Sequence, residues 1–355
     1  MSGVHVIVPF GVDDPTRPSG GNAYDRHVCS GLAASGWSVR EHVVPGTWPR
    51  PDAASFAALA DVMRHIPDGA VVLLDGLIAC MTPEVLVPQA ARLRLVVLVH
   101  MPFGDRMEDD VPDDAERRER EVLSAAAAVV ATSAWTRGRL LELYPLPADH
   151  VHVAQPGVSA ADLVPGTADG GALICVAAVI PRKGQDVLLE ALAGLTDLPW
   201  HCTFVGTLDR EPRFVARLRL RAEQGGFADR LTFAGPRTGA DLERSYAAAD
   251  LLVLASRGES YGMVVTEALA RGVPAVVSDI GGLPEALGCA ADGTRPGLLV
   301  SPGDVPALAS ALRDWLRDAA LRERLRDAAR TRRTALAGWP DTTSVVAGVL
   351  AGAVA

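Results

Sequence analysis

The chain has 355 residues, of which 49% are hydrophobic and 5% aromatic, and its formal net charge is −9. This length exceeds what one ordinary hydrophobic core accommodates and predicts two domains. The negative charge argues against a nucleic-acid-binding surface, and the arginine-rich stretches alternate with Asp and Glu, as solvated helix faces do. We therefore expect no nucleic acid partner.

The first ten residues carry no basic leader, and no apolar run reaches the roughly 18 residues that a membrane-spanning helix needs. We expect no integral membrane segment and a cytoplasmic location. The five cysteines include no Cys-x-x-Cys pair, which predicts buried free thiols.

In the first half of the chain, short apolar runs alternate with helical patterns, which predicts a parallel sheet with crossover helices. The predicted strands are 4–8, 71–74, 95–99, 129–132 and 151–154. Helices are predicted between them, including 23–35 and 133–144. A Pro- and Gly-rich stretch at 164–171 then interrupts the pattern and predicts a domain boundary.

The second half repeats the alternation, so the fold class is α/β with two doubly wound, Rossmann-like domains. Its predicted strands are 173–179, 202–205, 231–234, 251–254, 275–278 and 297–300. Its predicted helices include 186–195, 213–224 and 240–248, followed by a helical region up to about 336 and a last helix in 339–355.

The segment that follows the strand at 251–254 predicts a ligand site. A Gly-containing turn leads into a helix, and Gly262 allows a ligand to come close to the backbone. The free amides of Met263 and Val264 at the helix N-terminus form an anion site. Glu259 lies in the preceding loop and Glu267 about one turn inside the helix, so we expect their carboxylates to meet one ligand at different points.

A second candidate is the single lysine among 34 Lys and Arg residues, Lys183. Where charge alone matters arginine has replaced lysine, so the remaining lysine indicates a site that needs a compact ammonium. Lys183 follows Arg182 in a loop between a predicted strand and helix. We expect this loop to lie beside a diphosphate.

Glu259-x7-Glu267, followed by Gly-Gly-Leu-Pro-Glu at 281–285, resembles the signature of retaining glycosyltransferases of the GT-B fold, family 4. The sequence departs from the usual Glu-Gly-Phe-Gly by carrying Ser260 and Tyr261. The resemblance implies two Rossmann-like domains that face each other across a cleft. The expected parts are an acceptor-side domain at 1–165, a nucleotide-sugar domain at 172–336, and a C-terminal helix at 337–355 that crosses back to the first domain.

The resemblance also implies roles for individual residues of the second domain. Glu259 would bind sugar hydroxyls and Glu267 the ribose. Arg182 and Lys183 would neutralise the phosphates of a nucleoside-diphosphate sugar, helped by the amides at Gly262, Met263 and Val264.

In the first domain, Gly20 and Gly21 lie in a predicted flexible loop after the first strand and would close on the sugar nucleotide. His100 ends the strand at 95–99, so its side chain should point toward the ligand. From residues alone it could equally be a structural histidine. The resemblance implies that His100 contacts the sugar of the sugar nucleotide.

The chain contains no Asp-x-Asp, and the pairs Asp13-Asp14, Asp109-Asp110 and Asp113-Asp114 have the context of turn or capping residues. We therefore expect metal-independent transfer. The resemblance implies transfer of a hexose-type sugar, without a cofactor, from a UDP- or GDP-type sugar nucleotide to a hydroxyl acceptor. The oligomeric state stays open. The alternatives are a sugar-nucleotide epimerase of the same fold and a non-catalytic nucleotide-binding protein of two domains.

Overall fold

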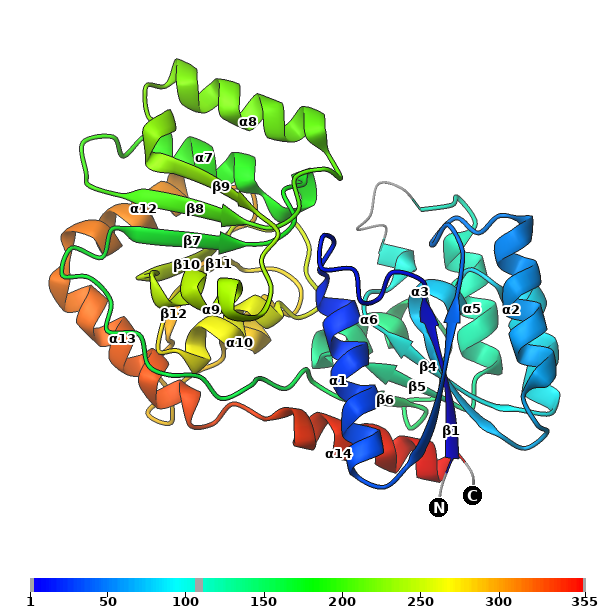
Figure 1. Cartoon of the computed structure of the whole chain (residues 1–355). Coiled ribbons are helices and arrows are strands. Elements are labelled where there is room, and N and C mark those ends of the chain that lie inside the picture. Colours follow the sequence, from blue (N-terminus) through cyan, green and yellow to red (C-terminus); the bar gives the residue numbers. More distant parts are fainter. Residues whose placement is uncertain (1–2, 106–110, 354–355) are drawn as a thin grey trace. The chain divides into compact units, whose positions relative to one another are not determined.

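The computed structural model describes residues 3–105 and 111–353, and the chain divides into two compact units (Figure 1). Unit 1 consists of Met1–Asp13, Ser19–Gly157 and Ala337–Ala355. Unit 2 consists of Asp14–Pro18 and Val158–Leu336. Each unit holds its own sheet and its own hydrophobic core.

Unit 1 contains a parallel sheet of six strands in the order β2-β1-β3-β4-β5-β6. Its strands are β1 Gly3–Pro9, β2 Ser38–Val44, β3 Val71–Asp75, β4 Arg94–Val99, β5 Ala128–Ala131 and β6 Val151–Val153. The five strands predicted here are confirmed. The strand β2 was not predicted, because this edge strand is largely exposed and its sequence, Ser-Val-Arg-Glu-His-Val-Val, is not an apolar run.

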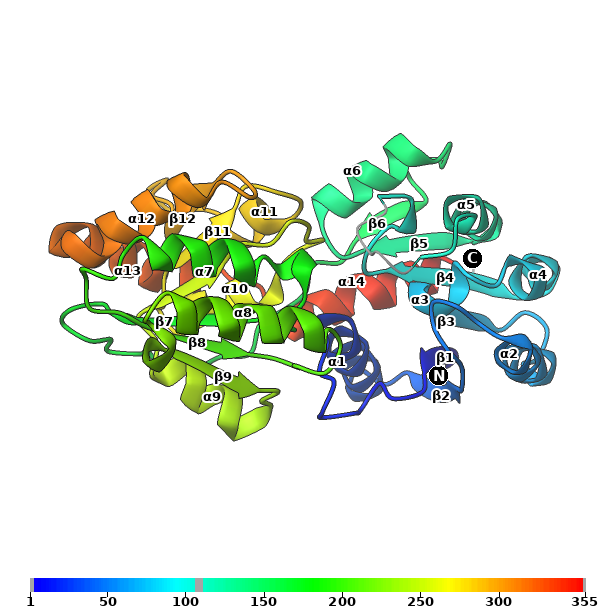
Figure 2. The same ribbon diagram turned by 90° about the horizontal axis from the view of Figure 1, so that it is seen from above.

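Helices cover both faces of this sheet. They are α1 Gly20–Ala34, α2 Ala53–His65, α3 Gly76–Ala79, α4 Pro83–Leu86, α5 Ala115–Ala125, α6 Ala134–Leu143 and α14 Trp339–Gly352, with the short 3₁₀ turns η1 Val87–Ala91 and η2 Phe103–Asp105. Figure 2 shows α2, α4 and α5 along one side of the strands and α1 and α14 along the other. Two separate cores result, one on each face of the sheet.

The alternation of side chains along β4 shows how one strand serves both cores. Leu95, Val97 and Val99 join the core on the α2 side, whereas Val96 and Leu98 join the core on the α1 side. A strand buried on both faces therefore reads as a continuous apolar run.

The C-terminal helix α14 completes the core on the α1 side. Val346, Val349 and Leu350 are buried there, and each such side chain contributes roughly 1.5–3 kcal/mol when it leaves water. Thr342 Oγ1 donates a hydrogen bond of 2.7 Å to the carbonyl oxygen of Gln155. The last helix of the chain is thus part of unit 1.

Unit 2 contains a second parallel sheet of six strands in the order β12-β11-β10-β7-β8-β9. Its strands are β7 Ala172–Val176, β8 His201–Val205, β9 Leu231–Gly235, β10 Leu251–Leu254, β11 Ala275–Ser278 and β12 Gly297–Val300. All six predicted strands are confirmed, although β7 ends three residues before the predicted end at 179. The strand order reverses between β10 and β7, and sheets of this kind bind ligands at the carboxyl ends of the strands at such a point.

The helices of unit 2 are α7 Gln185–Ala193, α8 Pro212–Gln224, α9 Gly239–Ala247, α10 Met263–Ala270, α11 Leu283–Leu287, α12 Val305–Arg317 and α13 Ala319–Arg333, with the 3₁₀ turns η3 Pro181–Lys183 and η4 Ala228–Arg230. In Figure 1, α7 and α8 lie on one face of the sheet and α9 and α10 on the other. This arrangement agrees with the predicted doubly wound sheet.

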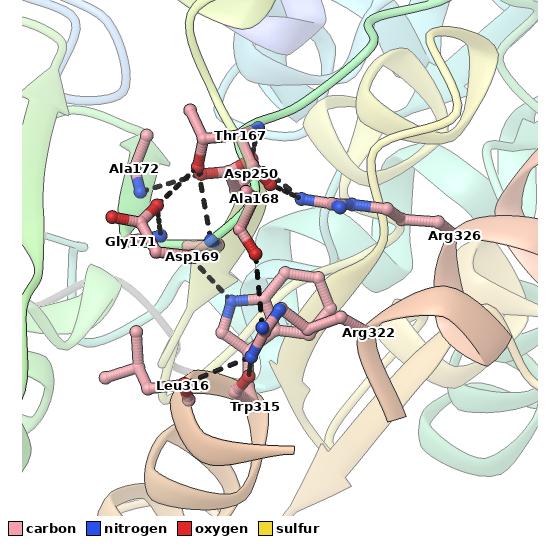
Figure 3. A network of polar contacts seen from close by, with 11 residues as sticks. Thr167, Ala168, Asp169, Gly171, Ala172, Asp250, Trp315, Leu316, Arg322 and Arg326 are labelled. Carbon is pink, nitrogen blue, oxygen red and sulfur yellow. Dashed lines mark hydrogen bonds and ion pairs between the residues drawn. The ribbon is translucent and has the colours of Figure 1, made fainter. Parts of the chain in front are cut away.

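The Pro- and Gly-rich stretch at 164–171 has the composition of a linker, but a buried aspartate fixes it to unit 2 (Figure 3). Asp250 Oδ2 accepts hydrogen bonds from the hydroxyl group of Thr167 at 2.5 Å and from the amide of Ala172 at 2.9 Å. Its Oδ1 accepts from the amide of Thr167 and pairs with Arg326 at 2.8 Å. Both carboxylate oxygens are therefore fully used.

A second arginine of α13 ties the same stretch to the end of α12. The guanidinium group of Arg322 donates to the carbonyl oxygens of Trp315, Leu316 and Ala168 (Figure 3). The indole of Trp315 donates a hydrogen bond of 2.8 Å to the carbonyl oxygen of Gly170. These bonds hold the backbone that leads into β7.

Candidate functional site

The lysine loop of unit 2 lies at the switch point of the sheet, between β7 and α7. Lys183 is the last residue of η3, and Gly184 follows it with φ of 68° in the left-handed region. A Cβ atom at Gly184 would lie 1.9 Å from the carbonyl oxygen of Ala255, directly after β10. Only glycine allows this contact, which places Lys183 beside the loop that follows β10.

In that loop Lys183 meets the first of the two predicted glutamates. Lys183 Nζ lies 2.5 Å from Glu259 Oε1, and the hydroxyl group of Ser256 donates to the same oxygen at 3.0 Å. Glu259 is only 8% exposed. Burial by itself would raise the pKa of Glu259, but the positive charges of Lys183 and Arg182 outweigh it, and the pKa lies below its ordinary value. Glu259 is therefore ionised at neutral pH.

The Gly-Gly pair of the predicted motif shapes the Glu259 loop from the other side. A Cβ atom at Gly281 would lie 1.9 Å from the carbonyl oxygen of Glu259, and one at Gly282 would lie 2.1 Å from that of Ser260. The amide of Gly282 donates a hydrogen bond of 2.9 Å to the carbonyl oxygen of Glu259. The two glycines thus allow a close backbone contact that holds the glutamate in place.

Helix α10 begins directly after this loop. Gly262 precedes it with φ of 96°, again in the left-handed region, and its carbonyl oxygen accepts from the amide of Val265 at 2.9 Å. The amides of Met263 and Val264 belong to the first turn, where a helix offers no acceptor of its own. This geometry suits an anion next to the Lys183–Glu259 pair.

The second glutamate has a different environment. The buried hydroxyl group of Tyr246 donates a hydrogen bond of 2.7 Å to Glu267 Oε2. Burial raises the pKa of Glu267, and the Tyr246 bond and the charge of Arg271 only partly oppose this effect. The guanidinium group of Arg271 stacks over the Tyr246 ring at 4.7 Å and donates to the backbone carbonyl oxygen of Glu267. The carboxylate of Glu267 is thus held by the hydroxyl group of a tyrosine, whereas that of Glu259 is held by a cation.

In unit 1 the structure corrects the prediction of a flexible Gly-Gly loop. Helix α1 begins at Gly20, three residues before the predicted start at 23, so Gly20 and Gly21 form its first turn. Ser19 caps the helix because its hydroxyl group accepts from the amide of Asn22 at 3.1 Å. A Cβ atom at Gly21 would lie 3.2 Å from the ring of His100, so the glycine lets the helix start come close to this histidine.

His100 follows β4 directly, as predicted, and belongs to a cluster with two aspartates. His100 Nε2 lies 2.8 Å from Oδ1 of the buried Asp25 on α1, and Asp75 ends the neighbouring strand β3. Burial would lower the pKa of His100, but the charges of Asp25 and Asp75 outweigh it and raise that pKa. Burial, together with the charge of Asp25, raises the pKa of Asp75 to about 7.

Sequence reasoning missed four residues that the structure places beside the predicted ones: Ser256, Tyr246, Asp75 and Asp25. A signal existed for Asp75, because an aspartate at the end of an apolar parallel strand points toward a ligand edge. No signal in the sequence identified Asp25, which lies in the middle of a helix.

Within residues 3–105 and 111–353, one group of three potential metal ligands lies close together, formed by Asp25, Asp75 and His100. A hydrogen bond of 2.8 Å between His100 Nε2 and Asp25 Oδ1 links two members of this group. In the same ranges no helix combines the length and the hydropathy that crossing a bilayer requires.

Other expectations have mixed outcomes. Four cysteines are buried, but Cys289 is exposed, so the prediction of buried thiols is wrong for it. Asp14 forms the predicted turn by accepting from the amide of Thr16 at 2.9 Å. Asp114 immediately precedes α5, without a capping hydrogen bond from its side chain. The pair Asp109-Asp110 lies outside the described residues.

Comparison with known families assigns both halves of the chain. The family described as "Glycosyltransferase Family 4" matches residues 4–162, and the family described as "Glycosyl transferases group 1" matches residues 168–332. The first range lies in unit 1 except for residues 14–18 and 158–162, which belong to unit 2. The second range lies entirely in unit 2.

Curated relatives agree with this assignment. A D-inositol 3-phosphate glycosyltransferase of Acidothermus cellulolyticus is 34% identical over 229 residues, which are 58% of this chain and 49% of that protein. The enzyme of the same name from Streptomyces avermitilis is 33% identical over 268 residues, which are 68% of this chain and 56% of that protein. The chain thus spans about half the length of the curated relatives it matches.

Solved structures share the fold over nearly the whole chain. Sucrose-phosphate synthase from Thermosynechococcus elongatus has a TM-score of 0.78 at 21% identity and 99% coverage of both chains. Anabaena HepE in complex with UDP-glucose has a TM-score of 0.78 at 19% identity, covering 99% of this chain and 100% of that one. With the matching family descriptions and the two six-stranded parallel sheets, these findings show that the chain belongs to glycosyltransferase family 4 and has the GT-B fold.

Proposed function

We propose that this protein is a retaining glycosyltransferase that moves a hexose-type sugar from a nucleoside-diphosphate sugar to a hydroxyl acceptor without a metal ion. The observation that carries the proposal is the Lys183–Glu259 pair at the switch point of unit 2, next to the start of α10. The names of two relatives support this proposal: a curated relative is named D-inositol 3-phosphate glycosyltransferase, and HepE is described in complex with UDP-glucose.

Lys183 and Arg182 supply the positive charge for the diphosphate. A lysine ammonium has three N–H bonds, so the bond to Glu259 leaves two for phosphate oxygens. As the sugar departs, negative charge grows on the leaving diphosphate, and a cation that is already in place stabilises that charge without rearranging. The first amides of α10, at Met263 and Val264, add fixed dipoles for the same anion.

The two glutamates serve different parts of the sugar nucleotide in this proposal. Glu259 is an ionised carboxylate, which only accepts hydrogen bonds, and is suited to sugar hydroxyl groups. Glu267 lies one turn into α10 and is suited to the ribose diol. His100, Gly20 and Gly21 contribute from unit 1, on the strength of the family resemblance. The leaving phosphate takes the acceptor proton, so no dedicated base is needed.

The main test removes the lysine. Lys183→Ala alone would leave Glu259 buried without its cation, which destabilises the loop as well as the chemistry. The double variant Lys183→Ala with Glu259→Gln leaves no ionised carboxylate without its cation, and it is compared with Glu259→Gln alone, so that the loss of the Glu259 carboxylate is common to both. We expect Lys183→Ala relative to the unchanged protein, and the double variant relative to Glu259→Gln, to lower transfer from UDP-glucose by roughly 10²–10³-fold, as for the loss of one preorganised electrostatic contact. Lys183→Arg should restore only part of the rate, because a planar fork does not replace a compact ammonium.

The matched control is Arg244→Ala, which removes an exposed cation of unit 2 that pairs with Asp241 three residues away. Its transfer rate should stay within a factor of two of that of the unchanged protein. Normal turnover in Lys183→Ala with a folded protein would contradict the assignment of Lys183 to the diphosphate.

The class of reaction is tested separately. Transfer should persist in excess EDTA, and the product should keep the anomeric configuration of the sugar nucleotide when followed by NMR. Activity that disappears on chelation and returns with Mg²⁺ would refute the metal-independent mechanism. Interconversion of free sugar nucleotides would indicate an epimerase, and binding without turnover would indicate a nucleotide-binding protein.

The roles of the two glutamates are distinguished by calorimetry with UDP and with UDP-glucose. Glu267→Ala should weaken the binding of both ligands, because both contain the ribose. Glu259→Ala should weaken mainly the binding of UDP-glucose. Equal losses for both ligands in both variants would show that the roles are assigned wrongly.

A further inference from the structure

Three ionisable side chains of unit 1 come together at the carboxyl edge of its sheet. Asp75 ends β3, His100 follows β4, and Asp25 reaches them from α1. One ligand atom from each lies within 4.8 Å of the other two. The edge of the Tyr24 ring also contacts the His100 ring, with 5.3 Å between the ring centroids. These are the ionisable groups that the described part of unit 1 places against His100.

The hydrogen bond between Asp25 and His100 fixes the state of the ring. Asp25 is only 4% exposed, and its Oδ1 lies 2.8 Å from His100 Nε2. The bond joins a ring nitrogen to a carboxylate oxygen, which accepts, so Nε2 donates the proton of this bond. The His100 side chain is 22% exposed, and its other nitrogen, Nδ1, has no hydrogen-bond partner among the described residues.

The second carboxylate oxygen of Asp25 depends on Asp75 for a donor. Asp25 Oδ2 is buried, and within the described ranges no N–H or hydroxyl group donates to it. Asp75 hydrogen-bonds to Asp25 when its carboxyl group carries a proton, and the two residues line one small cavity. Burial and the charge of Asp25 raise the pKa of Asp75 to about 7, so this carboxyl group is mostly protonated below that pH and mostly ionised above it. Asp25 is the carboxylate that the ring meets directly, through the bond between Oδ1 and Nε2.

We propose that Asp25 is a positioning residue that holds His100 as an imidazolium, with Nε2–H directed at Asp25 and Nδ1–H offered to an oxygen atom of the sugar nucleotide. The identity of that ligand rests on the proposed function. Asp75 lies beside this pair and adds a second negative charge when its own proton is lost. The ring donates a hydrogen bond and keeps its proton, and no bond of the cluster is formed or broken during transfer.

The first test reads the ring directly. In protein labelled with ¹⁵N-histidine, two-bond ¹H–¹⁵N spectra report the protonation of each ring nitrogen across pH, and His100→Gln identifies the signals of His100. We expect a proton on Nε2 at every pH at which the ring is neutral. In Asp25→Asn the affinity of His100 for its second proton should fall at least tenfold, because one charge has gone while an amide oxygen can still accept from Nε2.

The matched control is Asp68→Asn, which removes a negative charge from an exposed position of unit 1 that pairs with Arg92. His100 should titrate unchanged in this variant. A neutral ring with its proton on Nδ1 in the unchanged protein would overturn the proposal without any variant. An unchanged pKa of His100 in Asp25→Asn would also overturn the proposal.

The second test reads catalysis, with hydrolysis or transfer of UDP-glucose as the reaction. Asp25→Asn should lower kcat about tenfold at pH 7.5 with little change in KM, and the fall of kcat at alkaline pH should move to lower pH. A uniform loss at all pH values would indicate a merely structural role and contradict the proposal. If no sugar nucleotide is turned over, the proposed function fails while the NMR result still decides the state of His100.

Discussion

Two buried aspartates, Asp250 in unit 2 and Asp25 in unit 1, have similar burial and opposite surroundings. Asp250 receives hydrogen bonds on both oxygens from Thr167, Ala172 and Arg326 (Figure 3). Asp25 uses one oxygen for His100, and no N–H or hydroxyl group of the described residues donates to the other, which depends on the carboxyl proton of Asp75. The first aspartate organises a backbone segment, whereas the second presents a titratable ring to solvent.

This difference in hydrogen bonding indicates how a buried polar network with a structural role can be distinguished from one with a functional role. A buried network in which every atom is bonded rigidifies the fold, and its charges have no capacity left for a ligand. A buried carboxylate with one oxygen that depends on a titratable neighbour of raised pKa is less fully satisfied, which is frequent at sites that act on ligands. The two aspartates should therefore respond differently to substitution.

The largest effect on stability is expected for Asp250→Ala. The substitution leaves Arg326 and two backbone amides without their acceptor, and loss of one partner of a buried ion pair typically costs about 3–5 kcal/mol. Urea unfolding followed by tryptophan fluorescence measures the change. Asp197→Ala is the control, because this aspartate is 52% exposed and also pairs with two arginines. It should change the free energy of unfolding by less than about 1 kcal/mol. Equal losses for both variants would remove the distinction between the two networks.

The next effect concerns the raised pKa of Asp75 in the Asp25 cluster. Its folded-state pKa of about 7 exceeds the unfolded value of about 4, so folding favours the protonated form, and stability falls as pH rises through this window. In Asp75→Asn the side chain cannot ionise, so the stability does not fall with pH for this reason. We expect the variant to be more stable than the unchanged protein by on the order of 2 kcal/mol at pH 8, and the difference to shrink toward pH 4. Urea unfolding at both pH values measures it, and a difference independent of pH would contradict the raised pKa.

The smallest effect is expected for Thr167→Val in the Asp250 network. The hydroxyl group of Thr167 donates to Asp250 Oδ2 and accepts from the amide of Gly170 at 3.1 Å. Asp250 keeps the amides of Thr167 and Ala172 and the guanidinium of Arg326, so we expect a loss of about 1 kcal/mol. The same unfolding assay resolves this value. A loss as large as that of Asp250→Ala would show that the hydroxyl group, rather than the aspartate, holds the segment.

Much of the fold could be predicted because parallel strands buried on both faces read as continuous apolar runs. The strand β2 escaped prediction because it lies at the sheet edge with most side chains exposed. The start of α1 was misplaced because glycines normally indicate a loop, whereas here Gly21 is needed where the helix meets His100. Local composition cannot report such a contact between distant segments.

The sequence by itself determined most strands of both sheets, and it indicated Lys183, Glu259 and Glu267 as candidates through their spacing and the single lysine. Only the tertiary structure decided which side chains meet: Lys183 and Glu259 are 76 residues apart, and Asp25 and His100 are 75 apart. Hydrophobic patterns fix local elements, because they depend on neighbours three or four positions away in a helix and two in a strand. Contacts between strand ends depend instead on the strand order of the sheet, which brings distant carboxyl ends to one edge.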